Sequence, residues 1–90
     1  MLSYCAMAVV KLAVGAVKQF TALPRTIRER VQRIVNRLKK WPEVSGIKPL
    51  SGDLAGWYRM RTGDYRVRFR VEGDLVIVDK IGHRKDVYDD

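Results

Sequence analysis

The feature that most constrains the fold is the stretch from Trp57 to Arg70, WYRMRTGDYRVRFR, in which arginines alternate with apolar or aromatic side chains on both sides of Thr62-Gly63-Asp64. Such alternation indicates an extended chain, because successive side chains of a strand point to opposite faces of a sheet. Two alternating runs separated by turn-forming residues predict a β-hairpin. We therefore expect a hairpin with one apolar face and one cationic face.

The cationic face of this hairpin carries five arginines, at Arg59, Arg61, Arg66, Arg68 and Arg70. Arginines on the solvent side of a sheet can serve solubility alone. Like charges on neighbouring strands repel and weaken pairing, however, and within the stretch only Asp64 offsets them. Because guanidinium groups suit phosphate oxygens, we interpret this face as a site for an anionic ligand.

Length and charge limit the possible functions. The chain has 90 residues, which predicts a single domain over 1–90 with one modest core, and residues 1–6 as an N-terminal extension. Lys and Arg number 18 against 10 Asp and Glu, a net charge of +8 that favours nucleic acid, an anionic membrane or an acidic protein as partner. The single cysteine, Cys5, excludes an intramolecular disulfide and fits a reducing cytoplasm.

The apolar run from Met1 to Val10 is not expected to direct export. It lacks a basic segment before the apolar residues, and it is too short to span a bilayer. We therefore expect a cytoplasmic protein with no membrane partner.

The other elements follow from hydrophobic periodicity and from turn signals. The β-branched pair near the N-terminus predicts a short strand at or near a sheet edge, and the last apolar run predicts a central strand covered on both faces. In chain order we expect a strand over Ala8–Leu12, a helix over Val14–Leu23, a second helix from Pro24 to Pro42, a loop over Val44–Gly56, the hairpin, and a strand over Leu75–Ile81. In the first helix, the apolar face is expected to comprise Ala13, Val14, Ala16, Val17 and Phe20.

The second helix has the most regular amphipathic pattern in the chain. Its apolar positions recur at helical spacing and comprise Ile27, Val31, Ile34, Val35, Leu38 and Trp41. Its other face is basic and comprises Arg25, Arg28, Arg30, Arg33, Arg37, Lys39 and Lys40. We interpret the basic side as a solvated face on which Glu29 pairs with Arg33, and as an alternative we consider a contact with RNA or an acidic partner.

This order of elements predicts an α+β fold. An N-terminal strand and a two-helix hairpin precede a three-stranded antiparallel meander, and together the strands form one small, mainly antiparallel sheet. We expect the helices to pack on one face of the sheet, which leaves the opposite face concave and basic.

The C-terminal segment GHRKDVY is expected to bring His83, Arg84 and Tyr88 beside the hairpin. The sequence contains no Gly-rich phosphate loop, paired-carboxylate signature or metal-ligand cluster, so we expect no cofactor and no metal. These residue types suit metal-free RNA cleavage, in which the ribose 2′-OH attacks the adjacent phosphate and the 5′-oxygen leaves. Arginines stabilise the phosphorane, histidine exchanges a proton near neutral pH, and tyrosine stacks on a base or orients the phosphate.

The stretch from Leu50 to Tyr88 resembles the RelE/ParE superfamily of bacterial and archaeal toxins, and the similarity extends back to Ala8. The segment VKQFTALP with the basic helix after it looks like the two-helix hairpin of the family, and GDYRVRF with GHRKDVY looks like its RelE-type branch. The resemblance implies the RelE-like fold and a ribosome-dependent endonuclease that cleaves messenger RNA in the A site. It also implies a cognate RelB-like antitoxin, and contact with operator DNA only through the antitoxin complex.

The resemblance also implies roles for individual residues. Arg59 and Arg61 match positions used for phosphate contact, and Arg66 matches the arginine that stabilises the transition state. Arg84 matches an arginine linked to the leaving group, His83 stands where some members carry a catalytic histidine, and Tyr88 matches a base-stacking tyrosine. Four further cations are expected to bind RNA around this set, namely Lys48, Arg68, Arg70 and Lys85.

Two alternatives remain open at this point. A ParE-type toxin, which inhibits gyrase, shares the fold but normally lacks the C-terminal His, Arg and Tyr set. A non-catalytic member could instead act as a binding module, in which the protein and its antitoxin together serve as a DNA-binding corepressor.

Overall fold

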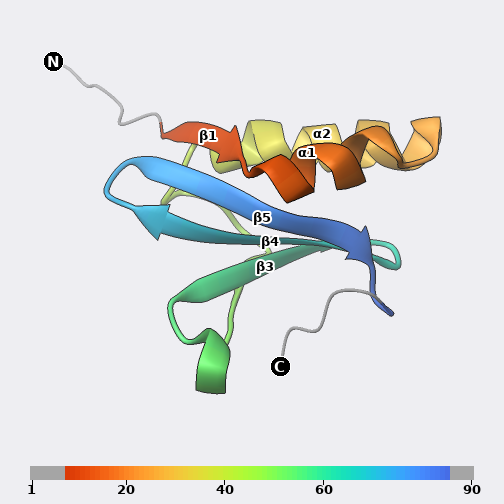
Figure 1. Ribbon diagram of the computed structural model, residues 1–90. Helices are drawn as coiled ribbons and strands as arrows, with labels where there is room; N and C mark the ends of the chain where they lie inside the picture. The colour runs from red at the N-terminus through yellow and green to blue at the C-terminus, as the bar shows by residue number, and fades with distance from the viewer. Residues whose placement is uncertain (1–7, 86–90) are drawn as a thin grey trace, which may run out of the picture.

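Two helices lie on one face of a five-stranded sheet in this computed structural model, which describes residues 8–85 (Figure 1). In chain order the elements are β1 (Val9–Leu12), α1 (Val14–Thr21), α2 (Arg25–Leu38), β2 (Lys48–Pro49), the short 3-10 helix η1 (Gly52–Leu54), β3 (Trp57–Thr62), β4 (Tyr65–Glu72) and β5 (Leu75–His83). The predicted α+β class is confirmed, and the predicted helices and strands occur in the predicted order, with β2 and η1 as additional elements.

The strands are arranged in the order β1-β5-β4-β3-β2. β1 pairs in parallel with β5, and all other pairs are antiparallel, so β1 lies at one edge as predicted. β2 forms the other edge and falls inside the segment 44–56 that was predicted to be a loop. This strand has two residues, which is too short to produce a periodic pattern, and its second residue is Pro49.

The central hairpin has the predicted alternation. Arg59 lies opposite Arg68 and Arg61 lies opposite Arg66, while Met60 between them lies opposite Val67. Because directly opposed residues of an antiparallel pair share a face, the arginines lie on one side and the apolar residues on the other. The two faces of the hairpin are therefore those that the sequence predicted.

The core lies between α2 and the apolar face of the sheet. α2 buries Val31, Ile34, Val35 and Leu38, and β4 and β5 bury Val67, Phe69, Val76, Val78 and Ile81. Phe69 is completely buried, and its ring centroid lies 5.7 Å from that of Trp41 and 5.6 Å from that of Tyr58. These aromatic rings link the segment that follows α2 to the start of the hairpin.

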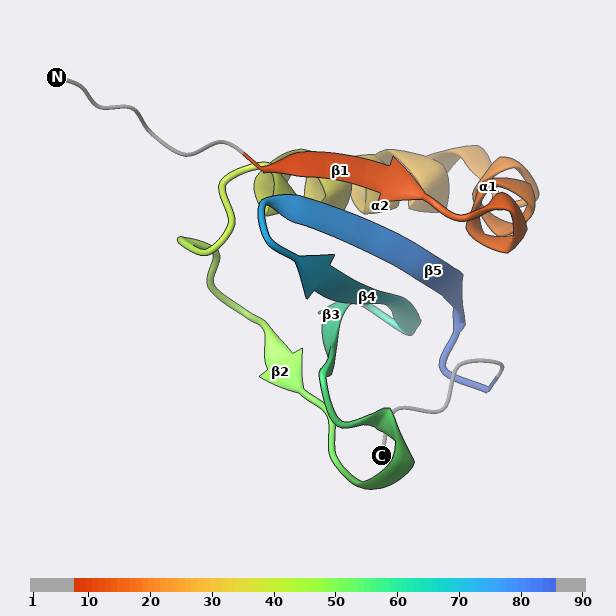
Figure 2. The ribbon, with the colours of Figure 1, turned by 60° about the vertical axis from the view of Figure 1, so that its left-hand side comes forward.

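Two expectations about burial were wrong. Val14 and Val17 were predicted to lie on the buried face of the first helix, but they are 75% and 45% exposed, because the short α1 fully buries only Ala16 of that face. β5 was predicted to be covered on both faces, yet its burial alternates, with Val76 and Val78 buried and Ile77 half-exposed. The helices cover only one face of the sheet, as the second view shows (Figure 2).

We predict that Phe69→Ala lowers the free energy of unfolding by about 3–5 kcal/mol, because it leaves a cavity where three aromatic rings meet. Val14→Ala should change it by less than about 0.5 kcal/mol, since that side chain is exposed. Urea denaturation of both variants measures the difference. Equal losses would contradict the position of the core described above.

Candidate functional site

A row of cations crosses the sheet on the face that the helices leave open. Lys48 on β2 lies opposite Arg59 on β3, Arg59 lies opposite Arg68 on β4, and Arg68 lies opposite Lys80 on β5. Directly opposed residues share a face, so these four side chains emerge on the same side. Lys48 and Lys80 are exposed, but Arg59 is only 7% exposed. The expectation that Arg59 lies on the solvent side of the hairpin is therefore only partly met.

The next row towards the hairpin turn is also basic. Arg61 lies opposite Arg66, and Arg66 lies opposite Gly82, so β5 adds no side chain at this level. The backbone N–H of Arg84 donates a hydrogen bond to the carbonyl of Asp64 at 2.7 Å, which holds the residue after β5 beside the hairpin turn. Three arginines of the predicted catalytic set thus lie near one end of the hairpin.

A carboxylate that the sequence reasoning missed lies on the same face. On β4, Arg68 pairs with Lys80, and the next residue, Phe69, pairs with Val78. Asp79 is therefore an extra residue that forms a β-bulge in β5. The guanidinium of Arg68 donates two hydrogen bonds to Asp79, from Nε to Oδ1 at 3.0 Å and from Nη2 to Oδ2 at 2.7 Å. The hydrogen bonds that Arg68 donates to Asp79 raise the pKa of Arg68 above its ordinary value. The positive charge of Arg68 is therefore compensated within the protein.

Arg70 also has partners within the chain. Its Nε lies 3.1 Å from a carboxylate oxygen of Glu72, in an exposed ion pair. The guanidinium carbons of Arg68 and Arg70 lie 5.0 Å and 5.5 Å from the ring centroid of Trp57, which indicates cation–π contacts. The arginines of the hairpin thus divide into a group near the turn and a pair held by Trp57 and two carboxylates.

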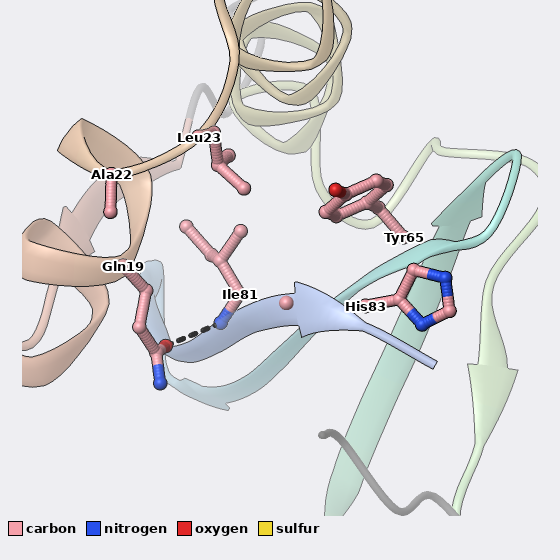
Figure 3. Close-up of a pocket in the computed structure, with 7 residues that line it drawn as sticks. Gln19, Ala22, Leu23, Tyr65, Ile81 and His83 are labelled. Atoms are coloured by element: carbon pink, nitrogen blue, oxygen red, sulfur yellow. Dashed lines mark hydrogen bonds between the residues drawn. The ribbon is translucent and has the colours of Figure 1, made fainter. Parts of the chain in front are cut away.

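His83 lies on a different side from the arginines. It pairs with Tyr65, and the two rings meet edge to face with centroids 5.5 Å apart (Figure 3). Together with Gln19, Leu23 and Ile81 they line a hollow of about 320 Å³ beside the end of α1, where the Gln19 side chain accepts a hydrogen bond from the Ile81 N–H at 2.7 Å. Strand alternation places Tyr65, Ile81 and His83 on the helix side of the sheet.

The expected single site is therefore only partly assembled by the described residues. Arg61 and Arg66 lie side by side on one face of the sheet, whereas His83 lies on the opposite face. Tyr88, the remaining residue of the set, lies outside the described residues, as does the predicted extension 1–6. Lys85 is exposed, and its N–H donates a hydrogen bond to Nδ1 of His83 at 3.2 Å.

Two further observations concern residues 8–85. The structure places no three His, Cys, Asp or Glu side chains of this range close enough together to bind a metal ion. No helix in the same range is both long enough and apolar enough to cross a membrane.

Comparison with known proteins identifies the class of protein that this fold and basic face represent. The model of the family described as "ParE toxin of type II toxin-antitoxin system, parDE" matches residues 10–88. The toxin RelE3 of Methanocaldococcus jannaschii is 32% identical over 76 residues, which cover 81% of this chain and 86% of the relative. The toxin RelG of Mycobacterium tuberculosis is 33% identical over 67 residues, which cover 72% of this chain and 76% of the relative.

A solved structure agrees with these relatives. A chain in the crystal structure of the toxin–antitoxin complex RelBE2 from Mycobacterium tuberculosis superposes with a TM-score of 0.76 and 27% identity, covering 87% of this chain and 92% of that one. The protein therefore belongs to the RelE/ParE superfamily of toxins of type II toxin–antitoxin systems. Within that superfamily it is a toxin of the RelE type.

We predict that Asp79→Asn lowers the free energy of unfolding by about 1–3 kcal/mol, because it weakens a charge-assisted pair whose side chains are only 13% and 21% exposed. Glu72→Gln is the matched control. It weakens the Arg70 pair, whose side chains are 41% and 58% exposed, and it should cost less than about 1 kcal/mol. Chemical denaturation measures both losses, and a larger loss for Glu72→Gln would contradict the role given to Asp79.

Proposed function

We propose that this toxin is a ribosome-dependent endoribonuclease that cleaves messenger RNA in the A site without a metal ion. The observation that carries the proposal is the direct cross-strand pairing of Arg61 with Arg66, beside Arg59, on the sheet face that the helices leave open. Two guanidinium groups in neighbouring positions on a sheet can each donate hydrogen bonds to the oxygens of one phosphate that lies between them.

The proposed reaction needs charge stabilisation and two proton transfers. The ribose 2′-oxygen forms a bond to the adjacent phosphorus and loses its proton, while the bond from phosphorus to the 5′-oxygen breaks and that oxygen gains a proton. Negative charge grows on the non-bridging oxygens of the phosphorane. We assign its stabilisation to Arg61 and Arg66, because fixed cations are effective where charge develops.

The two proton transfers need groups other than Arg61 and Arg66. Arginine is a poor general base, since its guanidinium remains protonated in proteins. His83 lies on the opposite face of the sheet from Arg66, so we assign it only a minor part in the proton transfers. We ascribe much of the rate to orientation of the RNA by the ribosome. Arg84, held beside the hairpin turn, is assigned to the leaving oxygen, and Tyr88 to stacking on a base.

The proposed partners are the ribosome with its message and a cognate RelB-like antitoxin, in the cytoplasm. Solved relatives from Mycobacterium tuberculosis and Methanococcus jannaschii are toxin–antitoxin complexes, the latter of RelB with RelE. On this chain, Val9, Val14 and Val17 are exposed large apolar side chains of β1 and α1, which would suit the apolar face of an antitoxin segment. Operator DNA is proposed as a partner only of the toxin–antitoxin complex.

A ParE-type toxin that inhibits gyrase is the second candidate. The matching family model is described as a ParE toxin, and this favours the candidate. The C-terminal GHRKDVY segment favours the RNase, because ParE-type toxins normally lack that set. Primer extension on translated messages after induction separates the two, since cuts in phase with codons indicate the RNase and intact transcripts with stalled replication indicate gyrase inhibition. Intact transcripts without growth inhibition would indicate a non-catalytic member.

We predict that Arg66→Ala lowers the rate of message cleavage by at least about 100-fold and abolishes growth inhibition, because it removes charge stabilisation at the phosphorane. Antitoxin binding should be retained. Arg25→Ala is the control, since its guanidinium lies on the exposed side of α2, 3.5 Å from Glu29. If Arg66→Ala remains as toxic as the parent, the reactive face has been assigned incorrectly.

We also predict that His83→Ala lowers the cleavage rate by less than about tenfold, because a general acid or base aligned with the phosphate would contribute more than that. The measurement is the rate of message cleavage in a purified translation system. A loss as large as that of Arg66→Ala would show that His83 reaches the phosphate from its position beside Tyr65.

A further inference from the structure

A second cluster of arginines surrounds a hollow between α2 and the end of β3. Its lining comprises Arg30, Arg33, Ile34 and Arg37 of α2, and Arg61 and Thr62 of β3, around a volume of about 220 Å³. Among the described residues the lining includes four arginines and no Asp or Glu. We call this feature the arginine hollow.

The fold accounts for the position of the arginine hollow. β2 pairs only with Tyr58 and Arg59, so within residues 8–85 no strand covers the edge of β3 at Arg61 and Thr62. On α2, Arg30, Arg33 and Arg37 are spaced three and four residues apart and share one side of the helix. A side-chain carbon added at Gly63 would lie 3.6 Å from Nη1 of Arg30, which shows that this arginine reaches the hairpin turn.

The charges of the arginine hollow are not compensated by carboxylates of residues 8–85. Arg37 donates hydrogen bonds to the carbonyl and the hydroxyl of Ser45, at 2.8 Å and 3.2 Å, and both acceptors are neutral. Glu29 was expected to pair with Arg33, but that expectation was wrong, because the carboxylate lies beside Arg25. Four cations that line one hollow repel each other, and an anion from outside would relieve that repulsion.

We infer that the arginine hollow binds a backbone phosphate of RNA, at a position away from the bond that is cut. This inference deepens the proposed function and rests on it. Arg61 lines the arginine hollow and also pairs with Arg66 on the reactive face, so one RNA strand can follow the uncovered edge of β3 between the two. Guanidinium forks match phosphate oxygens, and backbone contacts of this kind position a strand without reading its sequence.

The test uses a short single-stranded RNA that is fully 2′-O-methylated and cannot be cleaved by the proposed reaction, with fluorescence anisotropy as the readout at several salt concentrations. Arg30→Gln combined with Arg33→Gln should weaken binding by at least about tenfold at low salt and reduce the slope of log K against log salt by about 0.7, which corresponds to one lost phosphate contact. Lys39→Gln combined with Lys40→Gln removes the same charge from exposed side chains outside the arginine hollow and should weaken binding by less than about threefold.

Several outcomes distinguish the inference from its rivals. Equal losses for the two double variants, or no loss for either, would overturn it, since charge alone or another surface would then explain binding. A loss of antitoxin affinity with unchanged RNA affinity would also overturn it, and would make the arginine hollow an antitoxin contact. Loss of oligonucleotide binding by the Arg30 and Arg33 double variant alone supports the inference. Loss of binding to empty ribosomes with unchanged oligonucleotide binding would overturn it, because the phosphate would then belong to ribosomal RNA.

The RNase proposal can be refuted without refuting this inference. Because the oligonucleotide cannot be cut, its binding does not depend on catalysis. A protein that binds it through the arginine hollow but leaves translated messages intact would refute the RNase proposal and retain the phosphate site. Urea denaturation of each double variant checks that the fold is unchanged.

Discussion

The interaction on which the basic face depends is the paired hydrogen bond between Arg68 and Asp79. Arg59 and Arg68 are directly opposed cations on neighbouring strands, and Arg59 is almost completely buried. Like charges in such positions weaken strand pairing, and a buried cation is costly unless it is compensated. Asp79 removes the net charge of one member of the pair, with distances of 3.0 Å and 2.7 Å that indicate strong hydrogen bonds. A dense set of arginines thus becomes compatible with a stable sheet.

Two hairpin arginines have partners that fix their place at the end of the hairpin away from the turn. At the end away from the turn, Trp57 and two carboxylates hold Arg68 and Arg70. Towards the turn, Arg61 faces Arg66 and also lines the arginine hollow. Because Arg61 belongs both to the pair with Arg66 and to the arginine hollow, binding of a polyanion is expected near the turn, although the sequence distributes the arginines evenly.

Local patterns in the sequence predicted most of the fold. Alternation gave the two faces of the hairpin, and helical spacing gave the buried residues of α2, because both patterns depend only on near neighbours along the chain. The exposure of Val14 and Val17 was missed because it depends on how α1 lies against β5. The two-residue β2 was missed because it exists only through its pairing with β3.

The extra residue in β5 explains both the position of His83 and the presence of Asp79 beside the arginines. Val76 and Val78 face the core, so regular alternation would continue with Lys80 and Gly82 on the core side and would place Asp79, Ile81 and His83 on the arginine face. The bulge at Asp79 shifts this frame by one residue, which buries Ile81 and turns His83 towards Tyr65. It leaves Asp79 on the arginine face, bound to Arg68. The residue that compensates Arg68 is therefore also the residue that separates the histidine from the arginine face.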